Sequence, residues 1–575
     1  MPASRSQHSR VRVRRVVAVG TVVVAGLGIG VVCATTGGPN EQKTVRAYAR
    51  AWERGDWEAM RAQISAAARS RYPGRVFARQ FTAARDTATI RSLVTRKPRD
   101  AGDGRWRLPV VVQTRAFGPV TGELHLDLVR DGDAARIDWH PNLVFPGLPA
   151  GATLERTTAM PERADLLARD GTPLAQGAAR TSPLGAAAQA IVGALGPIPA
   201  DRALRAEQLG LPADAQVGIS GLERAFDEQL AGTPGGTLSA GGRILADRVP
   251  RKAQAVRTTI SPAVQQAAVD ALAGRLGGIV ALRPRTGEVL AAVGIGFSGL
   301  QPPGSTFKII TAAGALQAGI VRAGDAFPVQ TSATLSGVEL QNANREACGG
   351  TLAQAFADSC NSVFAPLGAK LGAQKLVAAA EAFGFDRPTG ITGAATASIP
   401  PPAEIGDDLA VGSSAIGQGR VQATALQMAI VAAAIGLRGE RPDVTLDPDR
   451  WKGDAPTHRA TTAKVARIVE RLMLGVVRHG TGTAAAIPGV RIAGKTGTAE
   501  LKSTQACEPD AQNPEKCPAD QQQDTTDTDA WFSAYAPAGS GHPRVAVGVL
   551  LVSAGAGGDT AAPAARQVLL AGLKD

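Results

Sequence analysis

Three short motifs, in a fixed order along the chain, contain side chains that together can carry out acyl transfer through a serine. The first is Ser305-Thr306-Phe307-Lys308, which follows a turn at Pro302-Pro303-Gly304. The apolar residues that come next predict a helix. Residues i and i+3 of a helix share a face, so the Lys308 amine can reach the Ser305 hydroxyl. A desolvated, neutral lysine can activate a serine, which indicates Ser305 as nucleophile and Lys308 as general base.

The second motif is Ser359-Cys360-Asn361, 54 residues beyond Ser305. A serine hydroxyl can pass a proton between a base and a leaving group. An amide can hold a substrate carbonyl and a lysine at the same time. By itself the tripeptide is equally typical of a helix N-cap, so its meaning depends on the other motifs.

The third motif is Lys495-Thr496-Gly497-Thr498, 136 residues beyond Ser359. Its apolar flanks predict an edge strand, and Gly497 leaves room for another backbone to approach that edge. Lys495 and the threonine hydroxyls can hold a carboxylate. A second cation near Lys308 would also lower the pKa of Lys308, because like charges disfavour the protonated form.

Taken together, the three motifs resemble the set shared by penicillin-binding proteins and serine β-lactamases. Four surrounding segments are similar to the monofunctional (class B) penicillin-binding proteins: Pro303–Lys308, Ile416–Gly419, Gly494–Glu500 and Trp531–Pro537. The resemblance implies a multi-domain α+β chain. Its catalytic domain would be an antiparallel sheet with helices on both faces, beside an all-helical subdomain.

The resemblance also implies a reaction, the cross-linking of peptidoglycan stem peptides by a D,D-transpeptidase. Ser305 would attack the penultimate carbonyl of D-Ala-D-Ala with Lys308 as base, and Ser359 would move the proton to the departing D-Ala. The oxyanion would bind the backbone N–H groups of Ser305 and Thr498. The substrate-binding residues would be Asn361, Lys495, Thr496, Gly497 and Thr498. β-Lactams would acylate Ser305, and no metal or organic cofactor is implied.

The length and charge of the chain set further bounds. Its 575 residues exceed one domain of about 150 residues, and the 44% hydrophobic and 19% charged fractions are those of a globular protein. The net charge is +12, and five of the basic residues are arginines within the segment 1–15. The remainder shows no basic stripe with interleaved aromatic residues, so nucleic-acid binding is not expected.

Residues 16–34 are an uncharged, apolar run that follows the basic segment. As a helix the run would span roughly 28 Å, close to the thickness of a bilayer core. The preceding arginines place the N-terminus in the cytoplasm and the rest of a single-pass plasma-membrane protein on the extracytoplasmic side. A cleavable signal peptide is the alternative, but the run is long for one and no Ala-x-Ala site follows.

Three domains are expected beyond the anchor. Residues 40–148 predict helix, turn, helix and then strands with a hairpin at Asp131-Gly132, which resembles an NTF2-like domain acting either as a binding cup or as a spacer. Residues 150–255 resemble the dimerisation or pedestal domain of penicillin-binding proteins, with a helix from Gly221 through Leu230. Residues 256–575 would be the transpeptidase domain. Divisome or elongation-complex proteins are candidate partners.

Four cysteines are spaced as two local pairs, Cys348 with Cys360 and Cys507 with Cys517. In an extracytoplasmic protein such pairs can form disulfides, and four free thiols are the alternative. A Cys348–Cys360 bridge would border the second motif.

Two other functions stay open at this point. One is hydrolysis on the same fold, as a D,D-carboxypeptidase or a β-lactamase, because the motifs do not distinguish water from an amine as acceptor. The other is a catalytically silent cell-wall sensor or division scaffold. The intact Ser305, Lys308 and Ser359 argue against the silent alternative.

Overall fold

The computed structural model describes residues 39–500 and 528–575, which form two compact units. Among the described residues, the first holds 39–81, 93–111 and 121–151, and the second holds 82–92, 112–120, 152–500 and 528–575. The predicted anchor at 16–34, the basic segment before it and the Cys507–Cys517 pair lie outside the described residues. Within the described ranges, no helix has the length and apolar character needed to cross a membrane.

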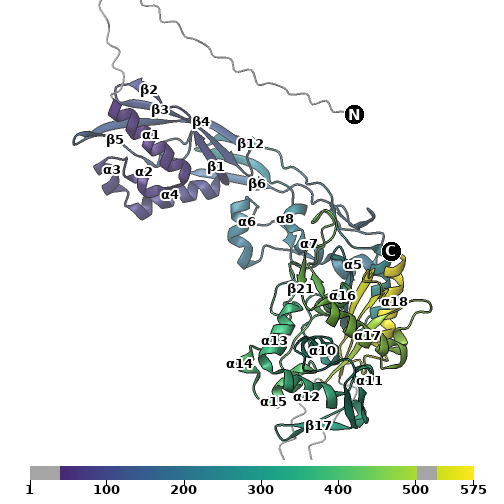
Figure 1. Ribbon diagram of the computed structural model, residues 1–575. Helices are drawn as coiled ribbons and strands as arrows, with labels where there is room; N and C mark the ends of the chain where they lie inside the picture. Colours follow the sequence, from purple (N-terminus) through teal and green to yellow (C-terminus); the bar gives the residue numbers. More distant parts are fainter. Residues whose placement is uncertain (1–38, 501–527) are drawn as a thin grey trace, which may run out of the picture. The chain divides into compact units, whose positions relative to one another are not determined.

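The N-terminal region is a run of helices followed by an antiparallel sheet (Figure 1). The predicted helix–turn–helix is confirmed, since Gly55, with φ +68°, separates the first two helices. The predicted hairpin is confirmed too, with Asp131 opposite Ala134. The sheet has the order β1-β3-β4-β5, with β2 paired to β3. The elements are α1 (Pro39–Arg54), α2 (Trp57–Arg61), α3 (Ala66–Arg71), α4 (Gly74–Thr87), β1 (Ile90–Thr95), β2 (Arg99–Gly102), β3 (Arg105–Thr114), β4 (Pro119–Asp131) and β5 (Ala134–Ile137).

Aromatic side chains fill the interior of the first unit. Tyr48, Phe77 and Trp139 are fully buried, and Phe81 is nearly so. The Phe77 and Trp139 rings lie 4.7 Å apart, and Trp139 Nε1 donates a hydrogen bond of 3.1 Å to the Tyr48 hydroxyl. These contacts form the aromatic core of the first unit.

The pedestal region of the second unit consists of small sheets and short helices. Its strands form three small sheets with the orders β12-β11-β6, β13-β7-β8 and β10-β9. They are β6 (Leu154–Ala159), β7 (Leu166–Leu167), β8 (Pro173–Ala175), β9 (Leu195–Gly196), β10 (Val217–Gly218), β11 (Gly235–Ala240), β12 (Arg243–Arg248) and β13 (Val256–Arg257). Its helices are α5 (Ala186–Val192), α6 (Ala203–Leu209), α7 (Gly221–Ala225) and α8 (Asp227–Leu230).

The single helix predicted from Gly221 through Leu230 is wrong, because the structure breaks it into α7 and α8 at Phe226. The break lets Asp227 turn its carboxylate onto the Gly218 amide, which donates a hydrogen bond of 2.7 Å. A tertiary contact thus replaces one continuous helix.

A buried ionic cluster holds the pedestal together. Glu223 is 1% exposed and lies 2.6 Å from Arg163 and 2.5 Å from Arg180. Arg163 also bonds Asp227 at 2.8 Å, and Arg202 pairs with the same carboxylate. Removing one partner of such a cluster leaves the others charged and desolvated.

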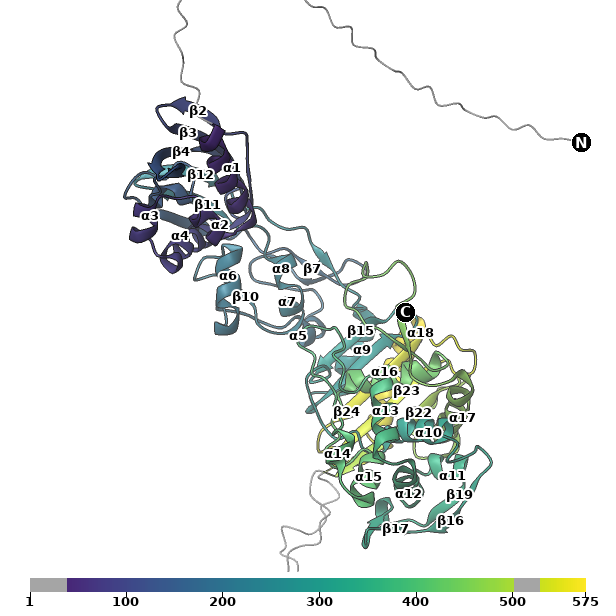
Figure 2. The ribbon, with the colours of Figure 1, turned by 60° about the vertical axis from the view of Figure 1, so that its left-hand side comes forward.

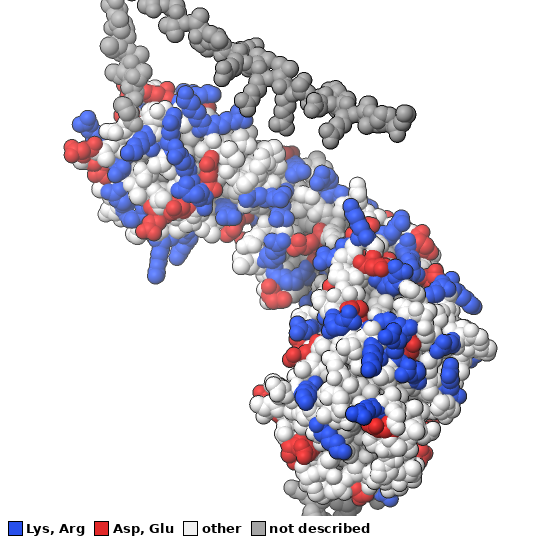
Figure 3. All heavy atoms as spheres, viewed as in Figure 1, with Lys and Arg blue, Asp and Glu red and all other residues white. Residues whose placement is uncertain are grey.

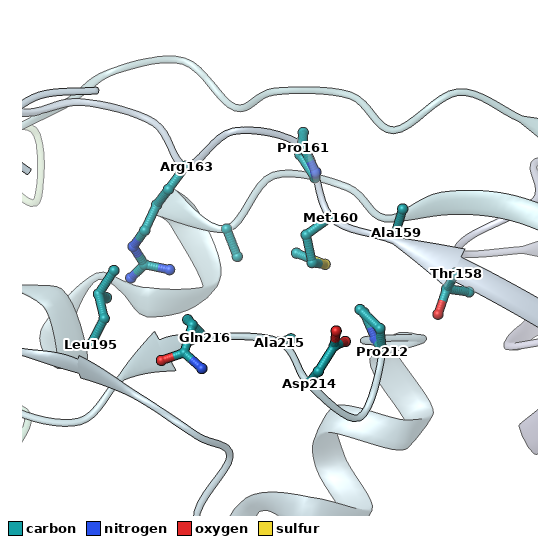
Figure 4. Close-up of a pocket in the computed structure, with 11 residues that line it drawn as sticks. Thr158, Ala159, Met160, Pro161, Arg163, Leu195, Pro212, Asp214, Ala215 and Gln216 are labelled. Atoms are coloured by element: carbon teal, nitrogen blue, oxygen red, sulfur yellow. The ribbon is translucent and has the colours of Figure 1, made fainter. Parts of the chain in front are cut away.

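A cavity of about 400 Å³ borders this cluster (Figure 4). Met160, Pro161, Leu195 and Pro212 contribute apolar walls, and the Arg163 side chain lies at one end. None of the lining residues belongs to the three motifs, so this cavity is separate from the acyl-transfer chemistry considered below.

The C-terminal part of the second unit is built on a five-stranded antiparallel sheet in the order β15-β14-β24-β23-β22 (Figures 1 and 2). β14 (Gly277–Arg283) and β15 (Glu288–Gly294) pair as an antiparallel hairpin. Near the C-terminus, β24 (Val545–Leu551) lies in the middle of the sheet and is followed by helix α18 (Ala561–Lys574). The sheet also contains β22 (Ala493–Glu500) and β23 (Thr528–Ala536).

Helices cover both faces of this sheet, as predicted. Ile279 and Ala281 of β14 pack with α9 (Pro262–Leu272) and α18, whereas Val280 and Leu282 point into the larger core around α16 (Ala425–Gly436). The alternation of β14 thus buries both of its faces, because successive side chains of a strand point to opposite sides.

The remaining helices and strands complete the second unit. The helices are α10 (Lys308–Gln317), α11 (Leu352–Ala357), α12 (Asn361–Leu371), α13 (Ala373–Ala382), α14 (Pro402–Ile405), α15 (Asp408–Ala415) and α17 (Ala463–His479). The strands are β16 (Ala326–Gln330), β17 (Ser332–Leu335), β18 (Val338–Gln341), β19 (Cys348–Thr351), β20 (Glu440–Pro442) and β21 (Thr457–Arg459).

The prediction of an all-helical subdomain is wrong in one respect, since β16 pairs with β19 and β17 pairs with β18 between helices α10 and α11. Ser336 and Gly337 both have positive φ, at 46° and 79°, which is the conformation of a type I′ hairpin turn.

Charged side chains are interspersed on the face of each unit that Figure 3 shows, with lysine and arginine next to aspartate and glutamate.

The ionic cluster generates a stability prediction. We expect Glu223→Ala to lower the free energy of unfolding by about 3–5 kcal/mol. Arg180 loses its acidic partner, and Arg163 keeps only Asp227. Urea unfolding of the purified protein measures this. The matched control is Glu228→Ala, whose pair with Arg205 is more than half exposed on both sides, so its expected cost is below about 1 kcal/mol. Equal effects of the two substitutions would contradict the prediction.

Candidate active site

Ser305 lies in a 3₁₀ turn, Gly304–Phe307, that leads directly into α10. In a 3₁₀ turn the side chains of residues i and i+3 lie almost in line along the helix axis. Ser305 and Lys308 therefore lie on the same side of the turn. The turn packs tightly against β22. A Cβ atom on Gly304, whose φ is +50°, would lie 2.6 Å from the Thr498 carbonyl oxygen. The main chains of Ser305 and Thr498 are therefore neighbours.

Gly497 takes part in the same close approach. A Cβ atom on Gly497 would lie 2.8 Å from the Pro303 carbonyl oxygen. The room that glycine leaves on this strand is thus used by the chain's own turn. The prediction that the third motif lies on an edge strand is confirmed, because β22 is the terminal strand of the sheet.

Lys308 is fully buried and bonded to the second motif. Its Nζ donates to the Ser359 carbonyl at 2.6 Å and to Asn361 Oδ1 at 2.7 Å, and it lies 3.4 Å from Ser359 Oγ. A neutral amine has two N–H donors and one lone pair. The two short bonds use both donors and leave the lone pair to accept a proton.

Lys495 approaches the same serine from the other side. Its Nζ donates to Ser359 Oγ at 2.8 Å and to the Thr496 carbonyl at 3.0 Å. The hydroxyl of Ser359 therefore lies between two lysines. All three motifs, separated widely in the chain, meet at this one oxygen.

The backbone of Ser359 is held in a costly conformation. Its φ is +63°, in the left-handed region that residues other than glycine occupy at a cost of about 1–3 kcal/mol. Ser359 lies between the end of α11 and the start of α12, and Cys360 is the N-cap of α12. Such strain persists only where surrounding structure enforces it, and it aims the hydroxyl between the lysines.

Two phenyl rings shield the amino groups of Lys308 and Lys495 from water. Lys308 Nζ lies 5.8 Å from the centre of the Phe364 ring, and Lys495 Nζ lies 5.6 Å from that of Phe356. Both rings are fully buried. Burial, followed by the charge of Lys495, lowers the pKa of Lys308 well below its usual value. Burial lowers the pKa of Lys495 to about 7.

The small strands β17 and β18 support the second motif. Asn361 Nδ2 donates to the Gln341 carbonyl at 2.9 Å, so in the resting structure its amide bridges Lys308 and β18. Of the two alternatives for Cys348 and Cys360, a disulfide or free thiols, the structure has the disulfide. It ties the start of β19 to the residue between Ser359 and Asn361.

Several residues that shape the site were not found by sequence reasoning. In the sequence, Phe356 and Phe364 are indistinguishable from ordinary core residues. Gln341 contacts Asn361 through its backbone carbonyl, which every residue type has. Thr481 was also missed. Its hydroxyl lies 2.6 Å from that of Thr496, and the only local hint is its place in Gly480-Thr481-Gly482-Thr483, just before the third motif.

The fold and the site together define a class of protein. An antiparallel sheet covered by helices on both faces, with a serine and two buried lysines converging at its edge strand, is the arrangement of serine acyl transferases that penicillins acylate.

Comparison with known proteins gives the family. The pattern of the penicillin-binding protein transpeptidase domain matches residues 277–570, and that of the penicillin-binding protein dimerisation domain matches residues 165–254. The chain therefore belongs to the penicillin-binding protein transpeptidase family. The predictions of a class B penicillin-binding protein and of a serine-type transpeptidase are confirmed.

Individual relatives agree with this assignment. Peptidoglycan D,D-transpeptidase PbpA of Mycolicibacterium smegmatis is 34% identical over 429 residues, which cover 62% of this chain and 80% of the relative. The crystal structure of PBPA from Mycobacterium tuberculosis has 29% identity and a TM-score of 0.55, and covers 72% of this chain and 99% of its own. A ceftriaxone acyl-enzyme complex of the latter protein matches with a TM-score of 0.54, 29% identity, and coverage of 72% and 98% of the two chains.

The disulfide next to the strained serine generates a second prediction. We expect reduction of the Cys348–Cys360 bond to slow acylation by a β-lactam, by up to about tenfold, because Ser359 can then relax from its left-handed conformation. Stopped-flow acylation before and after reduction, verified by thiol counting, measures this. The control is the Cys348→Ser/Cys360→Ser double variant, whose slow rate should not respond to reductant. An unchanged rate in fully reduced wild-type protein would contradict the prediction.

Proposed function

We propose that the protein is a peptidoglycan D,D-transpeptidase that cross-links stem peptides through an acyl-enzyme on Ser305. The observation that carries the proposal is the Ser359 hydroxyl lying between two buried lysines, next to the turn that holds Ser305. The identity of the relatives as D,D-transpeptidases supports it.

In the acylation step, the lone pair of neutral Lys308 accepts the Ser305 proton while Ser305 Oγ bonds the penultimate carbonyl carbon. The backbone N–H groups of Ser305 and Thr498 stabilise the oxyanion, because their main chains lie side by side. The intermediate collapses with cleavage of the peptide bond, and the proton passes by way of Ser359 to the departing D-Ala amine. An amine of a second stem peptide then attacks the ester, loses a proton to Lys308 and restores Ser305.

Substrate recognition falls to the third motif. Lys495 and the hydroxyls of Thr496 and Thr498 bind the terminal carboxylate, with Gly497 allowing the close approach of the strand. Gly557 N–H lies 3.4 Å from Thr498 Oγ1 and helps orient that hydroxyl. Asn361 has two roles in this proposal, since its amide orients Lys308 and, once a substrate displaces the β18 contact, holds the peptide.

We further propose that residues 16–34 anchor the protein in the plasma membrane, with the catalytic domain on the extracytoplasmic side. The domain at 40–148 is then an NTF2-like spacer rather than a binding cup, since aromatic rings fill its interior. Divisome or elongation-complex proteins stay candidate partners of the regions outside the catalytic domain.

The decisive experiment is covalent labelling with a fluorescent penicillin. We expect the ectodomain, residues 39–575, to be labelled and the Ser305→Ala variant to be unlabelled at the same concentration. Because a folded variant is needed, circular dichroism and thermal melting of both proteins serve as controls. Absence of labelling in folded wild-type protein would contradict the proposal and favour a silent scaffold. Rapid loss of the label would instead favour a β-lactamase.

The lysine pKa values generate a pH prediction. Acylation requires Lys308 neutral and Lys495 protonated, so kcat/KM should rise as Lys308 loses its proton and fall above about pH 7 as Lys495 loses its own. Acylation rates at subsaturating penicillin across a pH series measure this. The control is Lys495→Arg, which stays protonated and should move the descending limb well above pH 7. A wild-type rate that keeps rising to about pH 9 would contradict the prediction.

A further inference from the structure

Thr481 is placed where two of the motifs come together. It follows α17 by two residues, and its backbone N–H donates 3.1 Å to the carbonyl of Ala357, the last residue of α11. The same carbonyl lies 3.3 Å from Thr481 Oγ1, and the Thr496 hydroxyl of the third motif lies 2.6 Å away. Thr481 thus bridges the helix that leads to Ser359 and the strand that carries Lys495.

The hydrogen bonds of this pair can be arranged in two ways, because each hydroxyl has one proton. In the first, Thr496 donates to Thr481 and Thr481 donates to the Ala357 carbonyl. In the second, Thr481 donates to Thr496, and the Thr496 proton is free to point at a ligand. In both arrangements the Ala357 carbonyl accepts a hydrogen bond from the Thr481 backbone N–H. Changing from the first arrangement to the second therefore does not leave this carbonyl without a donor.

A bound carboxylate selects the second arrangement. A hydroxyl donating to an anion forms a charge-assisted bond that is stronger than a bond between neutral groups. Thr496 is nearly buried, so its oxygen needs a donor once its own proton has turned to the ligand. Thr481 is exposed and supplies that donor from outside the strand.

We propose that Thr481 is a positioning residue for substrate recognition: its hydroxyl donates to Thr496 Oγ1 and so directs the Thr496 proton at the terminal carboxylate of the acyl donor. The inference rests on the proposed function, because it names how the third motif reads that carboxylate. It predicts selectivity for donors with a free acid over donors in which the acid is masked.

The test compares two thioester acyl donors that differ only in their terminal group, a free carboxylate or its methyl ester. We expect Thr481→Val to lower kcat/KM about tenfold for the acid and less than about twofold for the ester, since one hydrogen bond to the carboxylate-binding hydroxyl is lost. Thr481→Ser should restore the acid rate. Thr483→Val, on the same loop and with an exposed side chain, is the matched control and should change neither rate.

A second measurement separates positioning from simple structural damage. In a Thr496→Val background the Thr481→Val substitution should have no further effect on the acid, since the two residues act through one hydroxyl. Equal losses of Thr481→Val on both donors, or additive losses in the double variant, would overturn the inference. Wild-type protein that penicillin does not acylate would overturn the proposed function itself. Acylated wild-type protein with an indifferent Thr481→Val overturns only the role of Thr481.

Discussion

The site depends on two lysines that share one serine hydroxyl in a dry environment. The two amines lie 3.4 and 2.8 Å from the same Ser359 oxygen. Two positive charges at most about 6 Å apart repel by about 3 kcal/mol at an effective dielectric of 20, and burial makes each charge still more costly. At least one lysine must therefore be neutral, and Lys308 is the one that burial and its neighbour both push in that direction. In the proposed mechanism, the proximity and burial of the two lysines supply the neutral amine that acts as general base.

Meeting this constraint takes contributions from distant parts of the chain. A 3₁₀ turn sets Ser305 against the edge strand, and the strained Ser359 aims its hydroxyl between the lysines. The disulfide and the small β17–β18 hairpin hold the strained segment, while Phe356 and Phe364 exclude water. Each of these features would be unfavourable or neutral by itself, and together they leave one arrangement of the three motifs.

The regions before the catalytic domain are stabilised by other interactions than those that hold the three motifs. The N-terminal unit is stabilised by an aromatic core, and the pedestal by arginines and carboxylates that neutralise one another out of water. Such an ionic cluster is specific in geometry because each charge needs its partner. A cavity lies beside it, lined by none of the motif residues. The motif residues and the ionic cluster that stabilises the pedestal thus lie in separate parts of the chain.

The sequence by itself identified the three motifs, the family and the edge position of the strand that carries the third motif. Motif residues are recognisable from type and spacing, and continuous apolar runs are typical of buried strands such as β14 and β24. Tertiary structure decided what local pattern cannot encode. The helix ends at Phe226, and Asp227 accepts a hydrogen bond from the Gly218 N–H. Strands β17 and β18 pair within the subdomain predicted to be helical, and Thr481 contacts Thr496. These outcomes depend on contacts between residues distant in the sequence or on bonds made by backbone atoms, which every residue type shares.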